Sequence, residues 1–478
     1  MRETTPVKSP RLNEQDQVMT TKYPYYVEPY NETERPRRFL EAFSAILQHS
    51  NYGFVLDTYS KITTKCARCA CNCQVFMESG ELRDVPCHRT ELLLRVYRRY
   101  FTLGGMVSSR LFNGFTLTDR YIDEMAENFY RCTACRRCKF GCPMGVDHGL
   151  MTHLARWILA EIGIVPKALV VAVREQLQGK TGNTSAIPVV ALKDTCEFLE
   201  EELLENYNIP AKFPMDVEGA EMVFFPAVSD YLLEPDTLMG NAAVMHLTNG
   251  SWTIGTGYYD GINYGLFYSD THLCNIVRKE AAEVKRLKAK KVLIGECGHA
   301  SRSAKAFIPT FCGGKKAPPV INIMEYSHKA LLDGRLKVKS GAILDRVTYH
   351  DPCNIARSKW IINQPRELLE AICKDYVDMV PGGQMNICCG GGGGTVSIDE
   401  IRKFRTGTGG HVKAEQIKAT GAKYVVAPCA NCKKQLREVC EDNGLHDVEI
   451  VGLHDLLLKA LDLEYYGITA PEKKEEEE

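Results

Sequence analysis

Lys423-Tyr-Val-Val-Ala-Pro-Cys429-Ala-Asn-Cys432 joins a short β-rich run directly to two cysteines. Upstream, Val347-Thr-Tyr-His-Asp-Pro-Cys353 places another cysteine after a similar run. Between them, Cys388 and Cys389 precede five glycines, Gly390 to Gly394. The carboxyl ends of parallel strands meet at one edge of a sheet, so these five thiols are expected to converge there. The pattern predicts an α/β lobe that holds a multi-iron site.

A second copy of this lobe is predicted toward the N-terminus. The run Lys291-Val-Leu-Ile-Gly-Glu-Cys297 matches residues 423–429, Met222–Phe225 matches Val347–Tyr349, and the run from Val320 matches that from Val448. Three matches in the same order predict two homologous α/β lobes, over residues 218–340 and 341–465.

The first lobe keeps only one of the five thiols, in Glu296-Cys297-Gly298-His299. Ala227 and Ala300 stand where the second lobe has Cys353 and Cys432. Cys297 and His299 are expected to face the five-cysteine site, either as catalytic residues or as a buried remnant.

An upstream cysteine block has the spacing of a ferredoxin. Cys132-x2-Cys135-x2-Cys138-x3-Cys142-Pro143 is the bacterial pattern, in which the fourth cysteine commonly binds the other cluster of a pair. Helical patterns over residues 92–103 and 121–130 replace the strands of a small bacterial ferredoxin. Residues 60–165 are therefore predicted to form an α-helical ferredoxin domain.

The preceding group, Cys66-x2-Cys69-x-Cys71-x-Cys73, lacks a thiol at the position of Thr63. Cys87 is the preferred replacement, with Cys71 as the alternative. The predicted ligand sets of two cubane 4Fe-4S clusters are then Cys66, Cys69, Cys87 and Cys142, and Cys73, Cys132, Cys135 and Cys138. One cubane plus a zinc site on the upstream group is the other interpretation, because four thiolates also satisfy tetrahedral zinc.

The remaining segments are predicted from composition and periodicity. Residues 1–59 form an N-terminal extension that could serve for docking, although an apolar stripe over residues 36–50 favours core packing. Residues 166–217 form a helical connection, and residues 466–478 an acidic tail. The fold class is thus α+β and multidomain.

Charge and cysteine usage narrow the classes of function. The 478 residues carry a formal net charge of −1, which does not favour a nucleic-acid surface. The twenty cysteines cluster at metal-ligand spacings, and no apolar stretch has the length of a membrane span. A protein that is cytoplasmic, or peripheral to a membrane, is expected.

Histidine supplies a further candidate. His350 precedes Cys353 and, with Asp351, could deliver a proton to a departing thiolate, since histidine titrates near neutral pH; a structural histidine is the alternative. The glycine run lacks the residues of a nucleotide-binding loop, so its glycines are assigned to close approach of a cluster.

The five-cysteine block resembles the cysteine-rich CCG domain of heterodisulfide reductases. His350-Asp-Pro-Cys-Asn-Ile-Ala-Arg357, the Cys-Cys-Gly run and the degenerate first lobe are most similar to DsrK-like subunits, also called Hdr-like menaquinol oxidoreductase iron-sulfur subunits. The resemblance covers roughly residues 60–465. It implies a noncubane 4Fe-4S cluster on Cys353, Cys388, Cys389, Cys429 and Cys432.

The same resemblance implies a function and partners. Members of the family are expected to take electrons from a membrane cytochrome b subunit that oxidises quinol, and to reduce a disulfide or trisulfide on the small protein DsrC. The expected location is the inner face of the cell membrane, through partner subunits. The alternatives are a non-catalytic electron-transfer subunit of a lactate, glycolate or glycerol-3-phosphate dehydrogenase complex, and a structural zinc scaffold.

Overall fold

The computed structural model describes residues 34–112 and 114–469. These residues form two compact units, each assembled from several segments. The first unit contains the described residues up to Arg174, with Tyr264–Leu273 and Ile387–Ala414. The second contains Glu175–Asn263, Cys274–Asn386 and the described residues from Glu415 onward. The segment that carries Cys388 and Cys389 therefore packs with the N-terminal helices, although the sequence pattern counts it with the second lobe.

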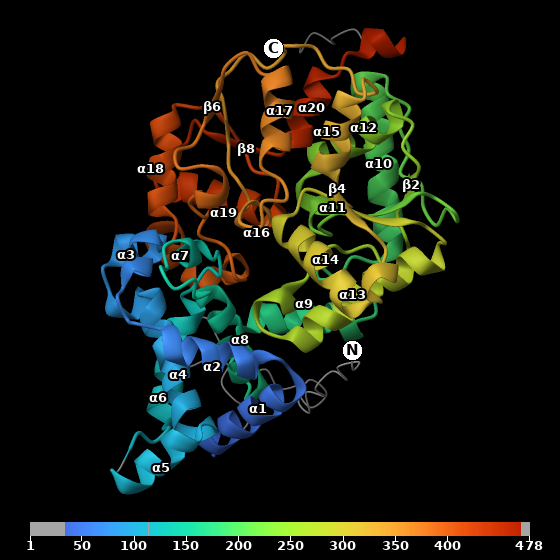
Figure 1. The fold of residues 1–478 in the computed structure, drawn as a ribbon. Helices are drawn as coiled ribbons and strands as arrows, with labels where there is room; N and C mark the ends of the chain where they lie inside the picture. The colour runs from blue at the N-terminus through green and yellow to red at the C-terminus, as the bar shows by residue number, and fades with distance from the viewer. Residues whose placement is uncertain (1–33, 113, 470–478) are drawn as a thin grey trace. The chain divides into compact units, whose positions relative to one another are not determined.

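The first unit is helical. Its helices are α1 (Arg35–His49), α2 (Tyr52–Ile62), α3 (Gln74–Ser79), α4 (Pro86–Phe101), α5 (Leu103–Leu111), α6 (Asp119–Tyr130), α7 (Arg137–Phe140), α8 (His148–Glu161) and the first part of α9 (Lys167–Gln178). Helices α4, α6 and α8 pack against one another around Leu93, Phe129 and Ile158, which are fully buried (Figure 1). The helical patterns predicted over residues 92–103 and 121–130 are confirmed as parts of α4 and α6.

The apolar stripe over residues 36–50 belongs to this core. Phe39, Phe43 and Ile46 of α1 are fully buried, and Phe43 packs against Phe101 at 4.7 Å between ring centroids. Core packing of these three residues is thus confirmed, and a docking role for the rest of the extension stays a prediction. Residues 1–33 lie outside the described residues. The boundary expected at residue 59 falls within α2.

The second unit contains two four-stranded parallel sheets. The first has the order β2-β1-β3-β4, from β1 (Met222–Phe225), β2 (Trp252–Thr253), β3 (Lys291–Ile294) and β4 (Val320–Asn322). The second has the order β6-β5-β7-β8, from β5 (Val347–Tyr349), β6 (Tyr376–Asp378), β7 (Tyr424–Val426) and β8 (Glu449–Val451). The strands matched in the sequence thus occupy equivalent places, β1 with β5, β3 with β7, and β4 with β8.

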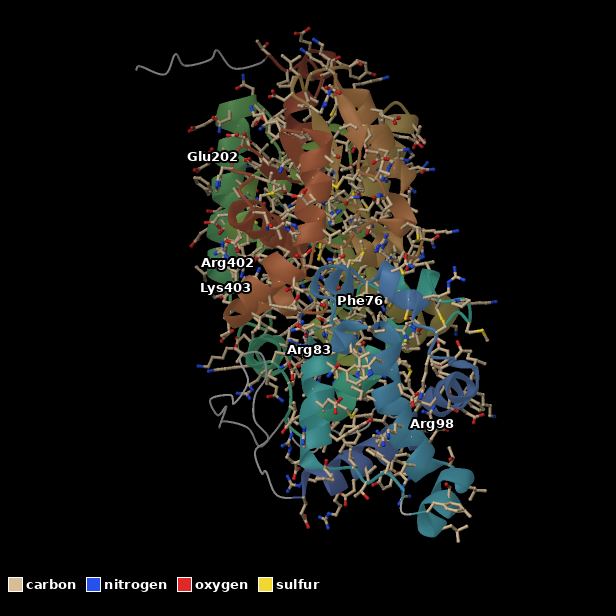
Figure 2. All side chains as sticks on the ribbon, turned by 90° about the vertical axis from the view of Figure 1, so that its left-hand side faces the viewer. Phe76, Arg83, Arg98, Glu202, Arg402 and Lys403 are labelled. Carbon is tan, nitrogen blue, oxygen red and sulfur yellow. The ribbon has the colours of Figure 1, made fainter. Side chains whose placement is uncertain are left out.

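Helices precede, connect and follow these strands. They are α10 (Val189–Tyr207), α11 (Asp230–Leu233), α12 (Pro235–Leu247), α13 (Asp270–Arg286), α14 (Gly298–Phe311), α15 (Ile323–Leu332), α16 (Cys353–Ala356), α17 (Asn363–Ile372), α18 (His411–Thr420), α19 (Ala430–Asp442) and α20 (Leu453–Ala460). Figure 2 shows side chains along α10, with Glu202 labelled. Helices α12 and α20, which follow β1 and β8, pack so closely that a Cβ on Gly240 would lie 2.2 Å from the carbonyl oxygen of His454.

The described chain is therefore a helix-rich α+β protein with two small parallel sheets. None of its described helices combines the length and the apolar character that a membrane crossing requires. The predicted acidic tail lies almost wholly beyond residue 469, outside the described residues.

Candidate iron-sulfur centres

The first candidate centre lies in the helical unit, in a small cavity. Its lining includes Cys66, Cys69, Cys87 and Cys142, together with Thr63, Pro143 and His148. Cys66 and Cys69 lie before and within a 3-10 turn, Arg68–Asn72, whereas Cys87 lies in the first turn of α4. Four thiols from three separate segments thus border one cavity, and Cys71 is not among its lining residues.

Cys69 and Cys87 form a hydrogen-bonded pair within this group. The Cys69 thiol donates to the Cys87 sulfur, which lowers the pKa of Cys87 to about 6 and raises the pKa of Cys69. Backbone amides near Cys87 also lower its pKa, as expected for a thiolate at a helix N-terminus. The site therefore favours a thiolate, which is the form that binds iron.

The second candidate centre gathers Cys73, Cys132, Cys135 and Cys138. Burial is the main reason that the pKa of Cys138 is raised well above its usual value, and the charges of Cys135, Cys132 and Cys73 raise it further. Burial also raises the pKa of Cys73, and the charges of Cys132 and Cys135 add to the rise. These mutual effects require that the four sulfurs lie close together. Cys73 comes from the upstream group, so each thiol group of the first unit combines residues from the upstream and downstream segments. That these two groups are the ligand sets of two clusters stays a prediction.

A buried cation faces this second group of thiols. Arg89 is 2% exposed, and its guanidinium lies 3.9 Å from the Cys73 sulfur. Burial acts to lower the pKa of Arg89, but the neighbouring sulfurs of Cys132, Cys73 and Cys138 raise it overall. Arg89 makes no ion pair within residues 34–112 and 114–469, because the nearby Asp84 is bound by Arg131. An anionic cluster bound to the four cysteines would supply the missing counter-charge, so the residues fit such a group.

The two centres lie next to each other. Cys69 and Cys87 from the first centre share a buried cluster with Cys138 from the second, and Phe76 of α3 packs against it (Figure 2). The charge of Cys138 also raises the pKa of Cys69. Adjacent thiol groups of this kind suit the transfer of single electrons from one cluster to the next.

The loop that carries Cys388 and Cys389 is bound to the second centre through Gln74. The side chain of Gln74, the residue after Cys73, is 2% exposed. Its oxygen accepts a hydrogen bond from the Cys388 amide at 2.8 Å, and its nitrogen donates to the Cys388 carbonyl at 3.0 Å and to the Gly409 carbonyl. One glutamine therefore fixes both backbone groups of Cys388.

The glycine run packs on the other cysteine loop of this centre. A Cβ on Gly392 would lie 2.4 Å from the carbonyl oxygen of Thr133, and a Cβ on Gly393 would lie 3.0 Å from that of Cys132. The fully buried Arg156 joins the two loops, donating to Cys132 O at 2.6 Å and Gly393 O at 2.8 Å. The sequence assigned the glycines to a cluster, whereas these contacts give them a second role in backbone packing.

The third candidate centre lies in the second unit, where the carboxyl ends of its two sheets meet. Cys297 follows β3 of the first sheet, and Cys429 follows β7 of the second. Their sulfurs and a ring nitrogen of His299 all lie within 4.8 Å of one another, and all three side chains are buried. The Cys297 sulfur lies 3.3 Å from Nδ1 of His299. Cys297 and His299 thus lie beside a predicted cluster ligand.

Helix N-termini and hydrogen bonds favour an anion at Cys429. Cys297 and Cys429 are the N-cap residues of α14 and α19, whose N-termini carry partial positive charge. The pKa of Cys429 is lowered well below its usual value by hydrogen bonds from Cys297, Cys432 and His299. The pKa of Cys297 is raised, first by burial and then by its bond to Cys429. The hydrogen bond between the two sulfurs therefore favours the neutral form at Cys297 and the anionic form at Cys429.

Close packing brings Cys353 to the same edge. A Cβ on Gly298 would lie 2.7 Å from Cβ of Pro352 and 3.7 Å from the Cys429 sulfur, so glycine is required there. Arg302 of α14 also donates to Asn354 of α16 at 3.0 Å. Cys353 begins α16 directly after Pro352.

His350 and Asp351 have different surroundings. A ring nitrogen of His350 lies within 4.8 Å of the Cys432 sulfur. The Asp351 carboxylate instead accepts two hydrogen bonds from Arg366, at 3.0 and 2.9 Å, and one from the Gly383 amide at 2.7 Å. Asp351 is therefore occupied in holding a loop, and His350 is the better placed of the two for proton transfer.

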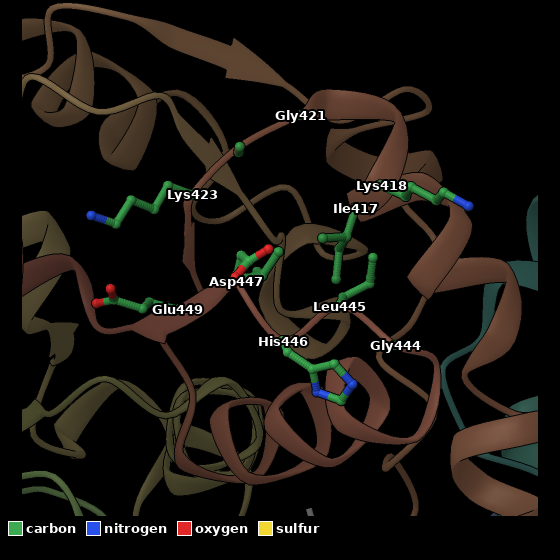
Figure 3. Close-up of a pocket in the computed structure, with 11 residues that line it drawn as sticks. Ile417, Lys418, Gly421, Lys423, Gly444, Leu445, His446, Asp447 and Glu449 are labelled. Carbon is green, nitrogen blue, oxygen red and sulfur yellow. The ribbon is translucent and has the colours of Figure 1, made fainter.

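The structure thus distributes the five predicted ligands between its two units. Cys353, Cys429 and Cys432 belong to the second unit, and Cys388 and Cys389 belong to the first. Their convergence on one cluster stays a prediction. The open pocket of Figure 3 has no part in it, because that pocket lies at the amino ends of β7 and β8, near Lys423 and Glu449, and its lining contains no cysteine.

Three residues with contacts to the candidate centres were not predicted, namely Gln74, Arg89 and Arg156. The only signal in the sequence is the position of Gln74 directly after Cys73. Arg89 and Arg156 lie on helical patterns, where arginine is ordinarily a surface residue.

Comparison with known proteins gives a consistent picture. Residues 347–437 match the model of the CCG cysteine-rich domain. Two relatives are named Hdr-like menaquinol oxidoreductase iron-sulfur subunits. The protein from Archaeoglobus profundus is 24% identical, with 91% of this chain and 85% of the relative covered. The protein from Archaeoglobus fulgidus is 25% identical, with 90% and 84% covered.

A more distant relative belongs to the dihydromethanophenazine:CoB–CoM heterodisulfide reductase of Methanosarcina mazei, as one of its subunits. It is 22% identical, with 84% of this chain and 94% of the relative covered. The chain therefore carries a CCG cysteine-rich domain and is similar, along about nine-tenths of its length, to Hdr-like menaquinol oxidoreductase iron-sulfur subunits.

Proposed function

We propose that this protein is the iron-sulfur catalytic subunit of a membrane-associated electron-transfer complex that reduces a disulfide or trisulfide. Electrons derived from quinol would pass through cubane clusters on the two four-cysteine groups and reach a noncubane cluster on Cys353, Cys388, Cys389, Cys429 and Cys432. The coarser part of this proposal, an iron-sulfur oxidoreductase subunit, agrees with the relatives named above.

The observation that carries the proposal is the meeting of Cys297, His299 and Cys429 at the carboxyl edges of the two sheets. A subunit that only stores and forwards electrons has no need of a thiol and an imidazole beside its ligand thiolates. Reduction of a disulfide does need them, because two electrons and two protons are consumed for every two thiols that form.

The chain's own residues would supply the protons and exclude water. When bound, the clusters supply electrons one at a time. His299, held 3.3 Å from the Cys297 sulfur, would protonate one departing thiolate, and His350 near Cys432 would protonate the other. His299 is 1% exposed and His350 is 1% exposed, so protons would be delivered in a site that bulk water does not reach.

The partners follow from the same proposal. A membrane cytochrome b subunit would donate the electrons, and a small DsrC-like protein would carry the disulfide or trisulfide. The protein would then lie on the inner face of the cell membrane, held there by partner subunits.

Serine substitution of Cys429 tests the proposal. In anaerobically purified protein, Cys429→Ser should abolish disulfide reduction and the EPR signal of the five-cysteine cluster, and should leave the signals of the two cubane clusters. Cys440→Ser is the matched control, because Cys440 is another buried thiol of α19 and has no ligand spacing. Unchanged turnover in Cys429→Ser would refute the proposed site.

A substitution of His299 distinguishes a subunit that reduces a disulfide from a subunit that only transfers electrons. His299→Gln should keep all cluster signals and lower turnover about a hundredfold, the usual contribution of a general acid. Full disulfide reductase activity in this variant would remove His299 from the mechanism. Intact cluster signals in a wild-type protein that reduces no disulfide would favour the electron-transfer subunit of a dehydrogenase complex.

A further inference from the structure

Buried polar side chains connect the Cys388 loop to the second four-cysteine centre. Most buried backbone groups bind other backbone groups or water, so two buried side chains that bind the backbone of two cysteine loops call for an explanation. Gln74 binds both backbone groups of Cys388, and Arg156 binds the carbonyls of Cys132 and Gly393. All these contacts lie within the first unit.

Arg156 has a charge with no partner of opposite sign in the described part of the chain. It is 0% exposed, and its hydrogen bonds go to the carbonyls of Phe129, Cys132 and Gly393. Burial lowers the pKa of Arg156, while the Cys132 thiolate acts to raise it. A buried guanidinium is costly unless a negative charge lies close to it. A cluster bound at Cys132, whose carbonyl accepts a hydrogen bond from Arg156 at 2.6 Å, would place that negative charge nearby.

We propose that Gln74 and Arg156 form the electron entry of the five-cysteine site, as positioning residues between it and the cluster on Cys73, Cys132, Cys135 and Cys138. This inference rests on the proposed function for the identity of both clusters. In the step itself one cluster loses one electron and the other gains it, and no bond forms or breaks.

The two residues have different tasks. Gln74 gives a continuous bonded route from Cys73 through its side chain to the Cys388 backbone, and electrons pass more readily along bonded routes than across gaps. Arg156 fixes the spacing between the Cys132 and Gly393 loops. Its positive charge also favours the reduced, more negative state of the cluster on Cys132, because opposite charges in a buried site attract strongly.

The test uses the full chain with its clusters loaded. Gln74→Leu keeps the volume and removes every hydrogen bond to Cys388. We expect normal iron content and normal EPR signals from each cluster, a weaker magnetic interaction between them, and electron arrival at the five-cysteine cluster slowed by about tenfold. Rapid mixing with a one-electron reductant measures the last quantity.

Gln176→Leu is the matched control. Gln176 is also fully buried and also binds a backbone carbonyl, that of Ile262 at 2.6 Å, but its side-chain nitrogen binds Tyr258, Asp260 and Ile262 and no cysteine loop. An equal slowing in both variants, or an unchanged rate in Gln74→Leu with both clusters present, would overturn the inference.

Arg156 supplies a second test if Gln74→Leu fails to fold. Arg156→Lys keeps the positive charge but loses the two-pronged guanidinium that binds Cys132 O and Gly393 O. The reduction potential of the cluster on Cys132 should therefore stay the same, while the magnetic interaction between the two clusters should weaken. Arg156→Met removes the charge, so the reduction potential of the cluster on Cys132 should fall. An unchanged potential in Arg156→Met and an unchanged interaction in Arg156→Lys would refute the assignment.

These outcomes separate the inference from the proposed function. Fast electron transfer between the clusters of a wild-type protein that reduces no disulfide would refute the proposed disulfide reduction, but not the role of Gln74 and Arg156 in electron transfer. Normal disulfide reduction and normal electron transfer in Gln74→Leu would refute the role of Gln74 in electron transfer, but not the proposed disulfide reduction.

Discussion

Cys71 and Cys87 are the two thiols that could complete the group of Cys66, Cys69 and Cys142, and their surroundings differ. Cys87 borders the same cavity and accepts a hydrogen bond from Cys69. Cys71 is exposed and lies outside the lining of that cavity. The local geometry therefore favours Cys87, which is also the thiol preferred from the sequence.

Paired serine variants would decide between the two thiols. Cys87→Ser should lose most of the iron of one cubane cluster and its EPR signal, because a hydroxyl is a poor substitute for a thiolate ligand. Cys71→Ser should keep the full iron content and both signals. The measurement is iron and acid-labile sulfide per chain, with EPR of the reduced protein. The reverse pattern would assign the ligand to Cys71.

Residue types and spacings grouped Cys66, Cys69, Cys87 and Cys142, which line one cavity, but gave no indication of the charged residues near the thiols of the helical unit. Ligand spacing is local, so Cys132, Cys135 and Cys138 can be recognised within seven residues of sequence. The burial of Arg89 and Arg156 depends on how helices distant in sequence pack. No local pattern distinguishes an arginine that faces a cluster from one that faces water.

At the scale of elements, the loop Ile387–Ala414 determines how the cysteine pair is held. The sequence explains its glycines by the approach of a cluster, but two of them also pack against the carbonyls of Thr133 and Cys132. Each of these positions leaves no room for a methyl group. The loop is thus fitted to the backbone of the Cys132 segment.

Alanine substitution of Gly392 tests this fit. A Cβ at 2.4 Å from Thr133 O forces the loops apart, so Gly392→Ala should destabilise the protein by about 1–3 kcal/mol, the range for overpacking. Gly407→Ala is the control in the same loop, because a Cβ there meets nothing within 4 Å. Thermal unfolding of the loaded protein measures both. Equal unfolding temperatures for the two variants would contradict the described packing.

The strands were predictable because short β-rich runs stop at proline or glycine and recur in order. The assignment of Ile387–Ala414 to the first unit was not predictable. This segment follows β6 in the chain, and its sequence carries no signal for its contacts with Gln74, Thr133 or Leu169. Partners that are about 220 to 310 residues away in sequence are set by tertiary packing alone.

At the scale of the molecule, a buried set of charges affects stability through pH. Asp230 is 1% exposed, and neither of its carboxylate oxygens has a hydrogen-bond partner among the residues that the structure describes. Burial raises the pKa of Asp230 to about 8; Lys433 opposes the rise, and Glu234, Glu296 and Cys429 add to it. The folded pKa lies above the unfolded value near 3.8, so the stabilisation is complete below about pH 4 and is lost as pH rises through 8.

Asp230→Asn should remove this dependence. The amide stays neutral, so the variant should unfold at a temperature at least about 2 °C above the wild type at pH 9, and at nearly the same temperature at pH 4. Scanning calorimetry across this pH range measures the difference. Asp194→Asn, at an exposed position of α10, is the control, and its unfolding temperature should not rise above that of the wild type at pH 9. A parallel pH profile for wild type and Asp230→Asn would show that Asp230 does not titrate as described.

Among the described residues, the guanidinium groups of Arg89 and Arg156 contact no carboxylate, and this has a consequence for the biogenesis of the protein. A chain that closed its helical unit before receiving metal would have to enclose two positive charges beside protonated thiols. Insertion of the cofactor should therefore precede or accompany closure of that unit. Cells starved of iron should accumulate a partly folded, protease-sensitive polypeptide, and a late supply of iron and sulfide should rescue only molecules that have not yet aggregated.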